Sequence, residues 1–183
     1  MFVTDLLKRE HRKVEDLFSR VEDASGTERA ELAATLFAEL ERHTTAEEEV
    51  FYPAIREAAG DDLVDESIEE HHVVDVLIAE LRSIEDVDAD EWTAKLTVMK
   101  ENVEHHVEEE EDEMFPDVED ALGADRLESL GSEVEGHQVR QRLEAHTVDE
   151  LQALAKEAGV DGRSDMDKAA LVDALCELRP AAV

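Results

Sequence analysis

The sequence has 183 residues, which is enough for one domain of ordinary size with a small appendage. Acidic residues outnumber basic residues by 51 to 18, which gives a net charge of -33, while the hydrophobic share of 42% is that of a globular protein. The single cysteine, Cys176, excludes an internal disulfide and a thiolate metal cluster. Molar salt would screen the repulsion between so many carboxylates, so we interpret the composition as halophilic and of haloarchaeal type. No apolar run approaches the ~20 residues of a membrane span and no signal peptide is recognisable, so we expect a soluble, cytoplasmic protein without a membrane partner.

Apolar residues recur every three or four positions through most of the chain, and the alternation typical of strands is absent. The pattern predicts an all-α protein in which short polar breaks separate five helices, at residues 4–22, 27–59, 62–85, 90–121 and 124–143. We expect Pro53 and Pro116 to kink or end the second and fourth helices. Long helices with short connections fold back on their neighbours, so residues 1–143 are predicted to form an up-down-up-down four-helix bundle.

Residues 144–183 carry far less net charge and are predicted to form a separate, small helix-link-helix module. Thr147 and Glu150 have the spacing of a capping box, which predicts a helix from there to about Ala158. The stretch GVDGRS then predicts a turn or extended link, followed by a second helix over residues 165–178.

Each of the four long helices places one histidine in its apolar stripe, where a bundle helix faces the core. In the second and fourth helices a glutamate follows the histidine by one turn and has the same phase. The residues predicted to face the interior in this way are His11, His43, Glu47, His71, His106 and Glu110.

This arrangement occurs twice in the chain. HTTAEEEVFYP at 43–53 and HVEEEEDEMFP at 106–116 share a histidine, a glutamate four residues later, and an aromatic residue and a proline at the end. The pattern indicates a duplicated helical hairpin, and two copies can pair about a pseudo-twofold axis so that equivalent donors meet in one core.

The buried glutamates indicate a metal centre. An ionised carboxylate in an apolar interior costs several kcal/mol unless it is paired or bound to a cation, and no lysine or arginine shares these stripes. Protonated glutamates and ordinary core histidines are the alternative. Four imidazoles and two carboxylates suit iron, manganese or zinc, and exceed the four donors of one tetrahedral zinc. We therefore predict a dinuclear centre, with iron as the metal.

Other polar residues leave alternatives open. Glu69 and His72 form the Glu-x-x-His pair of ferritin-like di-iron proteins, but the required second pair is absent. His72 and His105 lie out of phase and are interpreted as boundary residues or as partners of the ligands. Asp75, one turn after His71, is an ambiguous carboxylate that could bind metal or orient an imidazole.

These residues resemble the hemerythrin-like HHE cation-binding family over about residues 3–121. The motifs that carry the resemblance are His11, His43 with Glu47, the sequence Glu70-His71-His72, and His106 with Glu110. The resemblance implies a non-haem di-iron centre that binds or reacts with dioxygen. Oxygen-carrying hemerythrins have a histidine at the position of Asp75 and their last carboxylate at that of Glu111. These differences make sensing of dioxygen or nitric oxide, or iron handling in oxidative stress, at least as well supported as oxygen carriage.

Residues 147–175 resemble the helix-extended-helix modules of the Rho-N and SAP-like type, whose relatives often bind nucleic acid. Arg163, Lys156 and Lys168 would be the basic contacts, although Asp161 and Asp165 lie close to them in the sequence. Docking of a protein partner, or a merely structural role for the module, is the alternative.

The leading hypothesis is thus a di-iron binding protein with a small ligand such as dioxygen or nitric oxide, without catalytic residues of its own. A di-iron oxidoreductase acting on peroxide or nitric oxide is the second hypothesis. A nucleic-acid-associated regulator that uses the C-terminal module is the third.

Overall fold

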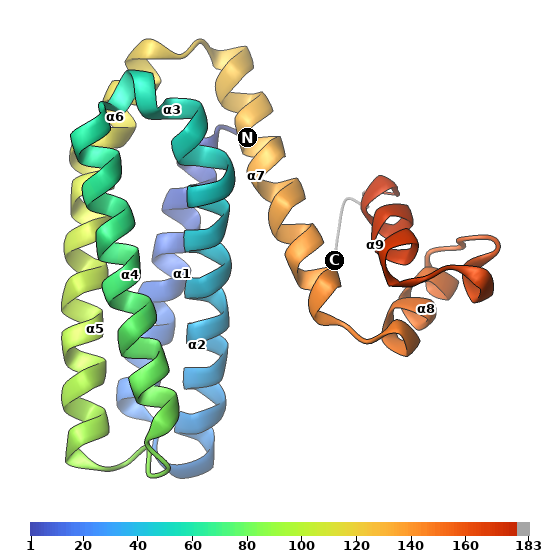
Figure 1. Cartoon of the computed structure of the whole chain (residues 1–183). Coiled ribbons are helices and arrows are strands. Elements are labelled where there is room, and N and C mark those ends of the chain that lie inside the picture. Colours follow the sequence, from blue (N-terminus) through green and yellow to red (C-terminus); the bar gives the residue numbers. More distant parts are fainter. Residues whose placement is uncertain (179–183) are drawn as a thin grey trace. The chain divides into compact units, whose positions relative to one another are not determined.

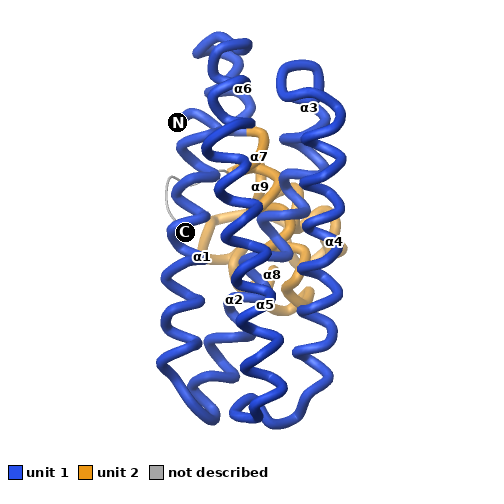
Figure 2. The backbone as a smooth tube through the Cα atoms, turned by 90° about the vertical axis from the view of Figure 1, so that its left-hand side faces the viewer, with its two compact units in different colours: residues 1–132 blue, residues 133–183 orange. Residues whose placement is uncertain are grey.

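The computed structural model describes residues 1–178, which fall into two compact units with a boundary between residues 132 and 133 (Figure 2). The described residues are helical or in turns and contain no strand, which confirms the predicted all-α class. The domain boundary proposed from composition, between residues 143 and 144, stays a prediction. Residues 179–183, the end of the second predicted domain, lie outside the described part of the chain.

Four long helices form the first unit: α1 (Val3–Asp23), α2 (Gly26–Ala46), α4 (Asp61–Ser83) and α5 (Asp90–Glu109). They lie side by side in Figures 1 and 2, and successive long helices run in opposite directions, as predicted. Short connections force this arrangement, and Gly60 supplies one of them with a backbone φ of 91°, which side chains disfavour. The Arg29 guanidinium, in α2, donates to the backbone carbonyls of Val21 and Glu22 at the end of α1. It also donates to the carbonyl of Val87, in the connection between α4 and α5, and so links the two hairpins.

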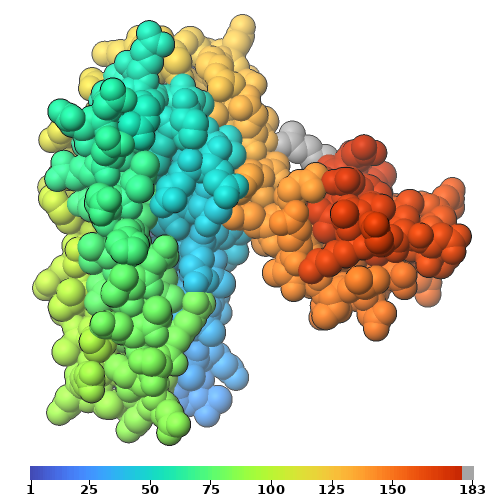
Figure 3. Space-filling view, in the orientation of Figure 1, coloured from blue at the N-terminus to red at the C-terminus, as the bar shows by residue number. Residues whose placement is uncertain are grey.

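Apolar side chains fill the bundle on both sides of the histidines. On one side lies a cluster that includes Phe18, Leu36, Ile78 and Trp92, all of them buried. On the other side, Phe51 and Phe115 are fully buried, with ring centroids 5.9 Å apart. The histidines therefore occupy a polar layer between two apolar layers. In the space-filling view, α4 forms part of the face of the first unit that is turned to the viewer (Figure 3).

Two π-helical turns interrupt the long helices at equivalent places. One, Glu47–Phe51, connects α2 to α3 (Tyr52–Ala59), and the other, Glu110–Met114, connects α5 to α6 (Phe115–Ala121). The sequence predicted that Pro53 and Pro116 would kink or end the second and fourth helices. Neither proline ends a helix. Each proline lies in the first turn of the α-helix that follows the π turn, where its missing N–H is tolerated. Such π turns occur often at functional sites, and here each begins at a predicted metal ligand.

The second unit has its own core. The helix α7 (Ala124–Ala145) contains the boundary between the units, and α8 (Val148–Glu157), a short 3₁₀ turn (Arg163–Asp165) and α9 (Lys168–Glu177) follow. Thr147 and Glu150 form the predicted capping box. The last helix begins at residue 168 rather than 165, because the Asp167 side chain accepts from the Ala170 N–H and caps it there. The buried core of the second unit contains Leu151, Ala155, Val160, Leu171, Val172 and Leu175.

Among the described residues, no helix is both long enough and apolar enough to cross a lipid bilayer.

Candidate metal centre

The six residues predicted to face the interior are all buried in the polar layer of the bundle. One histidine comes from each long helix, and the two glutamates are the first residues of the two π turns. The side chains of Glu47 and Glu110 have no solvent exposure, and the four histidines are at most 6% exposed: His11, His43, His71 and His106. The helical periodicity therefore placed these side chains correctly, whereas their role as metal ligands stays a prediction.

The Nδ1 atom of each histidine lies within hydrogen-bond distance of a carboxylate outside the layer. The Nδ1 to carboxylate oxygen distances are 2.8 or 2.9 Å, and the pairs are His11 with Glu111, His43 with Glu10, His71 with Glu48, and His106 with Glu70. An ionised carboxylate only accepts hydrogen bonds, so we assign the proton to Nδ1 in all four rings. This tautomer directs the Nε2 lone pair of each ring toward the centre, as in metal-binding histidines with an outer carboxylate.

The four outer carboxylates follow the duplication of the hairpin. Glu10 and Glu70 each precede the first histidine of their hairpin and bind the second histidine of the same hairpin. Glu48 and Glu111 each follow a second histidine by five residues and bind the first histidine of the other hairpin. The two hairpins are thus related by pseudo-twofold symmetry, and two of the four bonds cross between them.

At the centre, donor atoms face one another without hydrogen-bonding. The Glu47 oxygens lie 3.1 Å from His43 Nε2 and 3.4 Å from His71 Nε2, and Glu110 Oε2 lies 3.3 Å from His11 Nε2. Within residues 1–178, His11 Nε2, His43 Nε2, both Glu47 oxygens and Glu110 Oε2 are buried atoms without a hydrogen-bond partner. Unsatisfied buried groups of this kind are costly, and bound cations would satisfy them. The donor set therefore fits a metal.

The donor atoms define two candidate cation positions. His11, His43, Glu47 and Glu110 surround the first, which we call position 1, and Glu47, His71 and His106 surround the second, position 2. Within each group the ligand atoms lie within 4.8 Å of one another. Glu47 belongs to both groups and offers one oxygen to each, so the arrangement suits two cations bridged by a carboxylate.

Burial and neighbouring charges shift the pKa values of the glutamates and of three histidines in the centre. Burial, reinforced by the charge of Glu110, raises the pKa of Glu47 well above its ordinary value. Burial opposes ionisation of Glu110 as well, but the charges of His106, His11 and His43 outweigh it and lower its pKa to about 2. Burial lowers the pKa values of His43 and His71, whereas for His106 the charges of Glu110 and Glu70 outweigh burial and raise the pKa. A protonated His106 can donate to His71, whose Nε2 lies 3.1 Å away.

Aromatic rings close one side of this layer. Tyr52 stacks on His71 with ring centroids 5.6 Å apart, and Phe115 stacks on His11 at 5.9 Å. The Tyr52 hydroxyl donates a 3.0 Å hydrogen bond to Glu110 Oε1. Burial, together with the charges of Glu110 and Glu47, raises the pKa of Tyr52 well above its ordinary value. The sequence analysis did not indicate this role for the Tyr52 hydroxyl.

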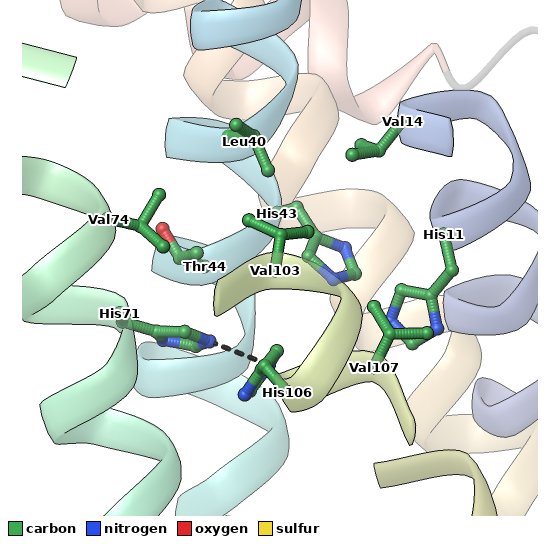
Figure 4. Close-up of a pocket in the computed structure, with 10 residues that line it drawn as sticks. All are labelled: His11, Val14, Leu40, His43, Thr44, His71, Val74, Val103, His106 and Val107. Carbon is green, nitrogen blue, oxygen red and sulfur yellow. Dashed lines mark hydrogen bonds between the residues drawn. The ribbon is translucent and has the colours of Figure 1, made fainter. Parts of the chain in front are cut away.

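A small cavity of about 20 Å³ lies on the other side of the layer (Figure 4). The four histidines line it, and the remaining lining is almost wholly apolar: Val14, Leu40, Val74, Val103 and Val107, with Thr44. A cavity of this size has room for a molecule about as large as one or two waters. A small, weakly polar molecule would fit there in contact with the histidine layer.

The structure also places the residues that sequence reasoning left open. His72 and Asp75 are exposed on α4 and contribute no atom to the candidate positions. His105 is 61% exposed and faces Glu70 and Glu109 at the surface. Glu111 binds the outer nitrogen of His11, while Arg12 donates to its other oxygen. In this geometry Glu110, rather than Glu111, is the inward carboxylate.

Sequence reasoning gave no role to Glu10 and Glu48, and it did not predict that Glu70 and Glu111 contact the outer nitrogens of the histidines. Acidic residues are abundant throughout the chain, so the sequence alone gave no reason to single out Glu48. The repeated spacing of the four outer carboxylates is the signal that could have identified them. Glu10 and Glu70 each precede a histidine by one residue, and Glu48 and Glu111 each follow one by five residues.

Comparisons with known proteins identify the family and the fold of the chain. Residues 3–118 match the family described as Hemerythrin HHE cation binding domain. A solved structure of a Hemerythrin HHE cation binding domain-containing protein from Mycobacterium kansasii superposes with a TM-score of 0.69, covers 94% of this chain and 98% of that one, and is 24% identical, which shows a shared fold. A protein named DNA nickase from Nostoc sp. is 25% identical over 146 residues, or 78% of this chain. The match spans only 41% of the length of that protein. Since the family match covers well over half of the sequence, the chain belongs to the hemerythrin HHE cation-binding domain family.

Proposed function

We propose that the first unit binds two iron ions and uses them to bind or sense a small ligand such as dioxygen or nitric oxide. The observation that carries this proposal is the set of five buried donor atoms without hydrogen-bond partners, contributed by His11, His43, Glu47 and Glu110. A stable apolar core would not retain such atoms, because each unsatisfied group costs about 1–3 kcal/mol. The ligand set would be His11, His43, Glu47, His71, His106 and Glu110.

Iron is supported over the alternatives by the chemistry of the donors. Mixed imidazole and carboxylate ligands are typical of non-haem iron, whereas calcium and magnesium prefer oxygen donors alone. When bound, iron supplies an exchangeable coordination position and redox activity toward dioxygen or nitric oxide. Manganese and zinc have the same donor preferences in part and are the metals to be compared with it.

The protein's own residues determine what can reach the centre. The outer carboxylates orient all four imidazoles, so their Nε2 atoms are in place before metal arrives. The apolar lining and the small volume of the cavity favour a diatomic ligand over any larger substrate. Asp75 lies on the surface where oxygen carriers have an additional histidine, which supports sensing or iron handling over oxygen carriage.

Metal analysis tests this proposal directly. Protein reconstituted with Fe²⁺ and freed of excess metal should contain about two irons per chain, and Glu47→Ala and Glu110→Ala should each lower this content sharply. Glu101→Ala, an exposed carboxylate on α5, is the matched control and should leave the content unchanged. A wild-type protein that retains no transition metal would refute the proposal. Reversible binding of nitric oxide to the loaded protein, without turnover, would support sensing over an oxidoreductase.

A second candidate function is nucleic-acid binding through the C-terminal module, supported by the similarity to a protein named DNA nickase. Lys156 and Lys168 are exposed, but so are Asp161, Asp165 and Asp167. Binding to phosphates depends on local positive charge, which these aspartates reduce. Retention of labelled DNA by the full chain in molar KCl, lost when residues 144–183 are removed, would support this function, and no retention by the full chain would exclude it.

A further inference from the structure

A separate group of possible metal ligands lies at the surface of the second hairpin. Glu70 on α4, with His105 and Glu109 on α5, offer one ligand atom each, and these atoms lie within 4.8 Å of one another. His105 Nε2 lies 3.4 Å from Glu109 Oε1 and 3.7 Å from Glu70 Oε1. The imidazole is 61% exposed, whereas the carboxylate side chains are only 24% and 17% exposed, so the group opens to solvent on the side of the imidazole.

The two carboxylates of this group lack a permanent positive partner. Within residues 1–178, neither Glu70 nor Glu109 forms an ion pair with a lysine or an arginine. The partners of Glu70 are His105 and His106, and the partner of Glu109 is His105. Glu109 Oε2 is also a buried atom without a hydrogen-bond partner in the described part of the chain. Such an atom is costly, and a cation bound by Glu109 would compensate it.

The duplication shows that the hairpin fold does not require these residues. The position of His105, one residue before the buried histidine, is occupied by Arg42 in the first hairpin, and that of Glu109, three residues after it, by Ala46. Arg42 forms an ion pair with Glu39, and Ala46 is buried. The first hairpin thus has a permanent cation and a methyl group where the second has an imidazole and a carboxylate, so the repeated fold does not account for the group.

We propose that Glu70, His105 and Glu109 form a third cation site, at the protein surface, for a divalent transition metal such as Zn²⁺ or Fe²⁺. One imidazole and two carboxylates suit these ions, and water completes the coordination. With three protein donors and an exposed imidazole, the site binds its cation more weakly than the buried layer does and exchanges it readily with solvent.

Glu70 connects this surface site to the buried layer. Its Oε1 atom faces His105, and its Oε2 atom accepts from His106 Nδ1 at 2.9 Å. A cation at Oε1 draws negative charge from the carboxylate and weakens the hydrogen bond that orients His106. Occupation of the surface site therefore alters position 2 of the buried centre. This consequence rests on the proposed metal centre, whereas the surface site itself does not.

Titration of the metal-free full chain with Zn²⁺, followed by calorimetry at pH 8 in molar KCl, tests the surface site. The salt screens diffuse attraction of cations to the other acidic residues. The wild type should bind a third Zn²⁺ in the weakest step, and His105→Ala and Glu109→Gln should each lose this step and retain the others. His72→Ala is the matched control, since it removes an exposed imidazole next to another buried histidine, and it should leave all steps unchanged.

Equal Zn²⁺ binding by the wild type and His105→Ala would refute the surface site and show that His105 serves only as an ion-pair partner of the two carboxylates. Equal losses in His105→Ala and His72→Ala would refute it too, since binding would then be diffuse. A step that depends on His105 and persists in Glu47→Ala would support the surface site even if the wild type retained no iron, a result that refutes the proposed function alone.

The connection through Glu70 has its own measurement. Zn²⁺ added to protein already loaded with Co²⁺ should shift the visible absorption bands of the buried Co²⁺ before any metal exchange, and His105→Ala should not show the shift. Bands that do not move while the third Zn²⁺ binds would refute the connection between the two sites.

Discussion

Replacing Glu47 with glutamine should stabilise the metal-free protein at alkaline pH and prevent stable metal binding. Glu47 is fully buried, and its two oxygens face the Nε2 atoms of His43 and His71 at 3.1 and 3.4 Å. Because those nitrogens carry lone pairs, an ionised Glu47 meets acceptors on both sides, whereas a protonated Glu47 can donate to one of them. A glutamine amide can donate to one of these nitrogens at every pH.

The size and pH dependence of this effect follow from the raised pKa of Glu47. The folded wild-type protein keeps a proton that the unfolded chain releases above about 4.5, the ordinary value for glutamate. The wild type therefore loses this contribution to its stability as the pH rises from 4.5 through the raised folded pKa, and Glu47→Gln does not. At pH 8 the variant should be more stable by about 2 kcal/mol, the cost of leaving a buried polar group unsatisfied. For a domain of this size that corresponds to roughly 6 °C in Tm.

Thermal unfolding of chelator-treated protein at pH 5 and pH 8, at one fixed salt concentration, measures this difference. The Tm advantage of Glu47→Gln should be smaller at pH 5 than at pH 8, while Fe²⁺ should raise the Tm of the wild type alone. The exposed substitution Glu101→Gln should show neither effect. A variant less stable than the wild type at pH 8, or a Tm difference independent of pH, would refute the assignment of Glu47 as an uncompensated buried acid.

Four further outcomes are expected. Glu111→Ala should weaken metal binding about 10- to 100-fold by releasing His11, whereas Glu108→Ala, at an exposed neighbouring position, should not, as measured by competition with a chelator. Val103→Ile adds one methylene group at the cavity and should weaken nitric oxide binding to the iron-loaded protein at unchanged iron content. An unchanged affinity for nitric oxide would show that the ligand does not bind in this cavity. Metal affinity should rise with pH and binding should release protons, because the pKa values of Glu47 and His106 are raised in the metal-free protein; calorimetry in buffers of different ionisation enthalpy detects this release, and its absence would contradict the protonation assigned here. The Tm of the metal-free protein should increase from 0.1 M to about 2 M KCl as salt screens the net charge of -33, and a flat or falling Tm would contradict a halophilic adaptation.

The bundle could be predicted from sequence because its helices follow one strong period. Leu96, Met99 and Val103 are spaced so that only a helix buries them together, and all three are in the core. The π turns could not be predicted in the same way. They begin at Glu47 and Glu110 and insert one residue into a pattern whose apolar positions continue on both sides, so periodicity alone gives no sign of them.

The candidate site was predictable only where polarity conflicts with burial. A glutamate in an apolar stripe, such as Glu47, is conspicuous because an uncompensated charge there is costly. Glu48 is next to it and lies outside the stripe, so nothing in its local pattern separates it from the many other acidic residues. Its partner, His71, is distant in sequence, and only the fold brings the two together at 2.9 Å. The Tyr52 hydroxyl was missed for a similar reason, since its acceptor, Glu110, lies on another helix.

The crossed bonds from Glu48 to His71 and from Glu111 to His11 mean that neither half of the bundle is self-sufficient. A solitary hairpin would have an imidazole without its orienting acid and an acid without its imidazole. Two identical copies of one hairpin would satisfy all four bonds, since the offsets are the same in both. The present chain can thus be understood as a fused homodimer, in which joining the copies allowed equivalent positions of the two halves to carry different residues, as Tyr52 and Phe115 do.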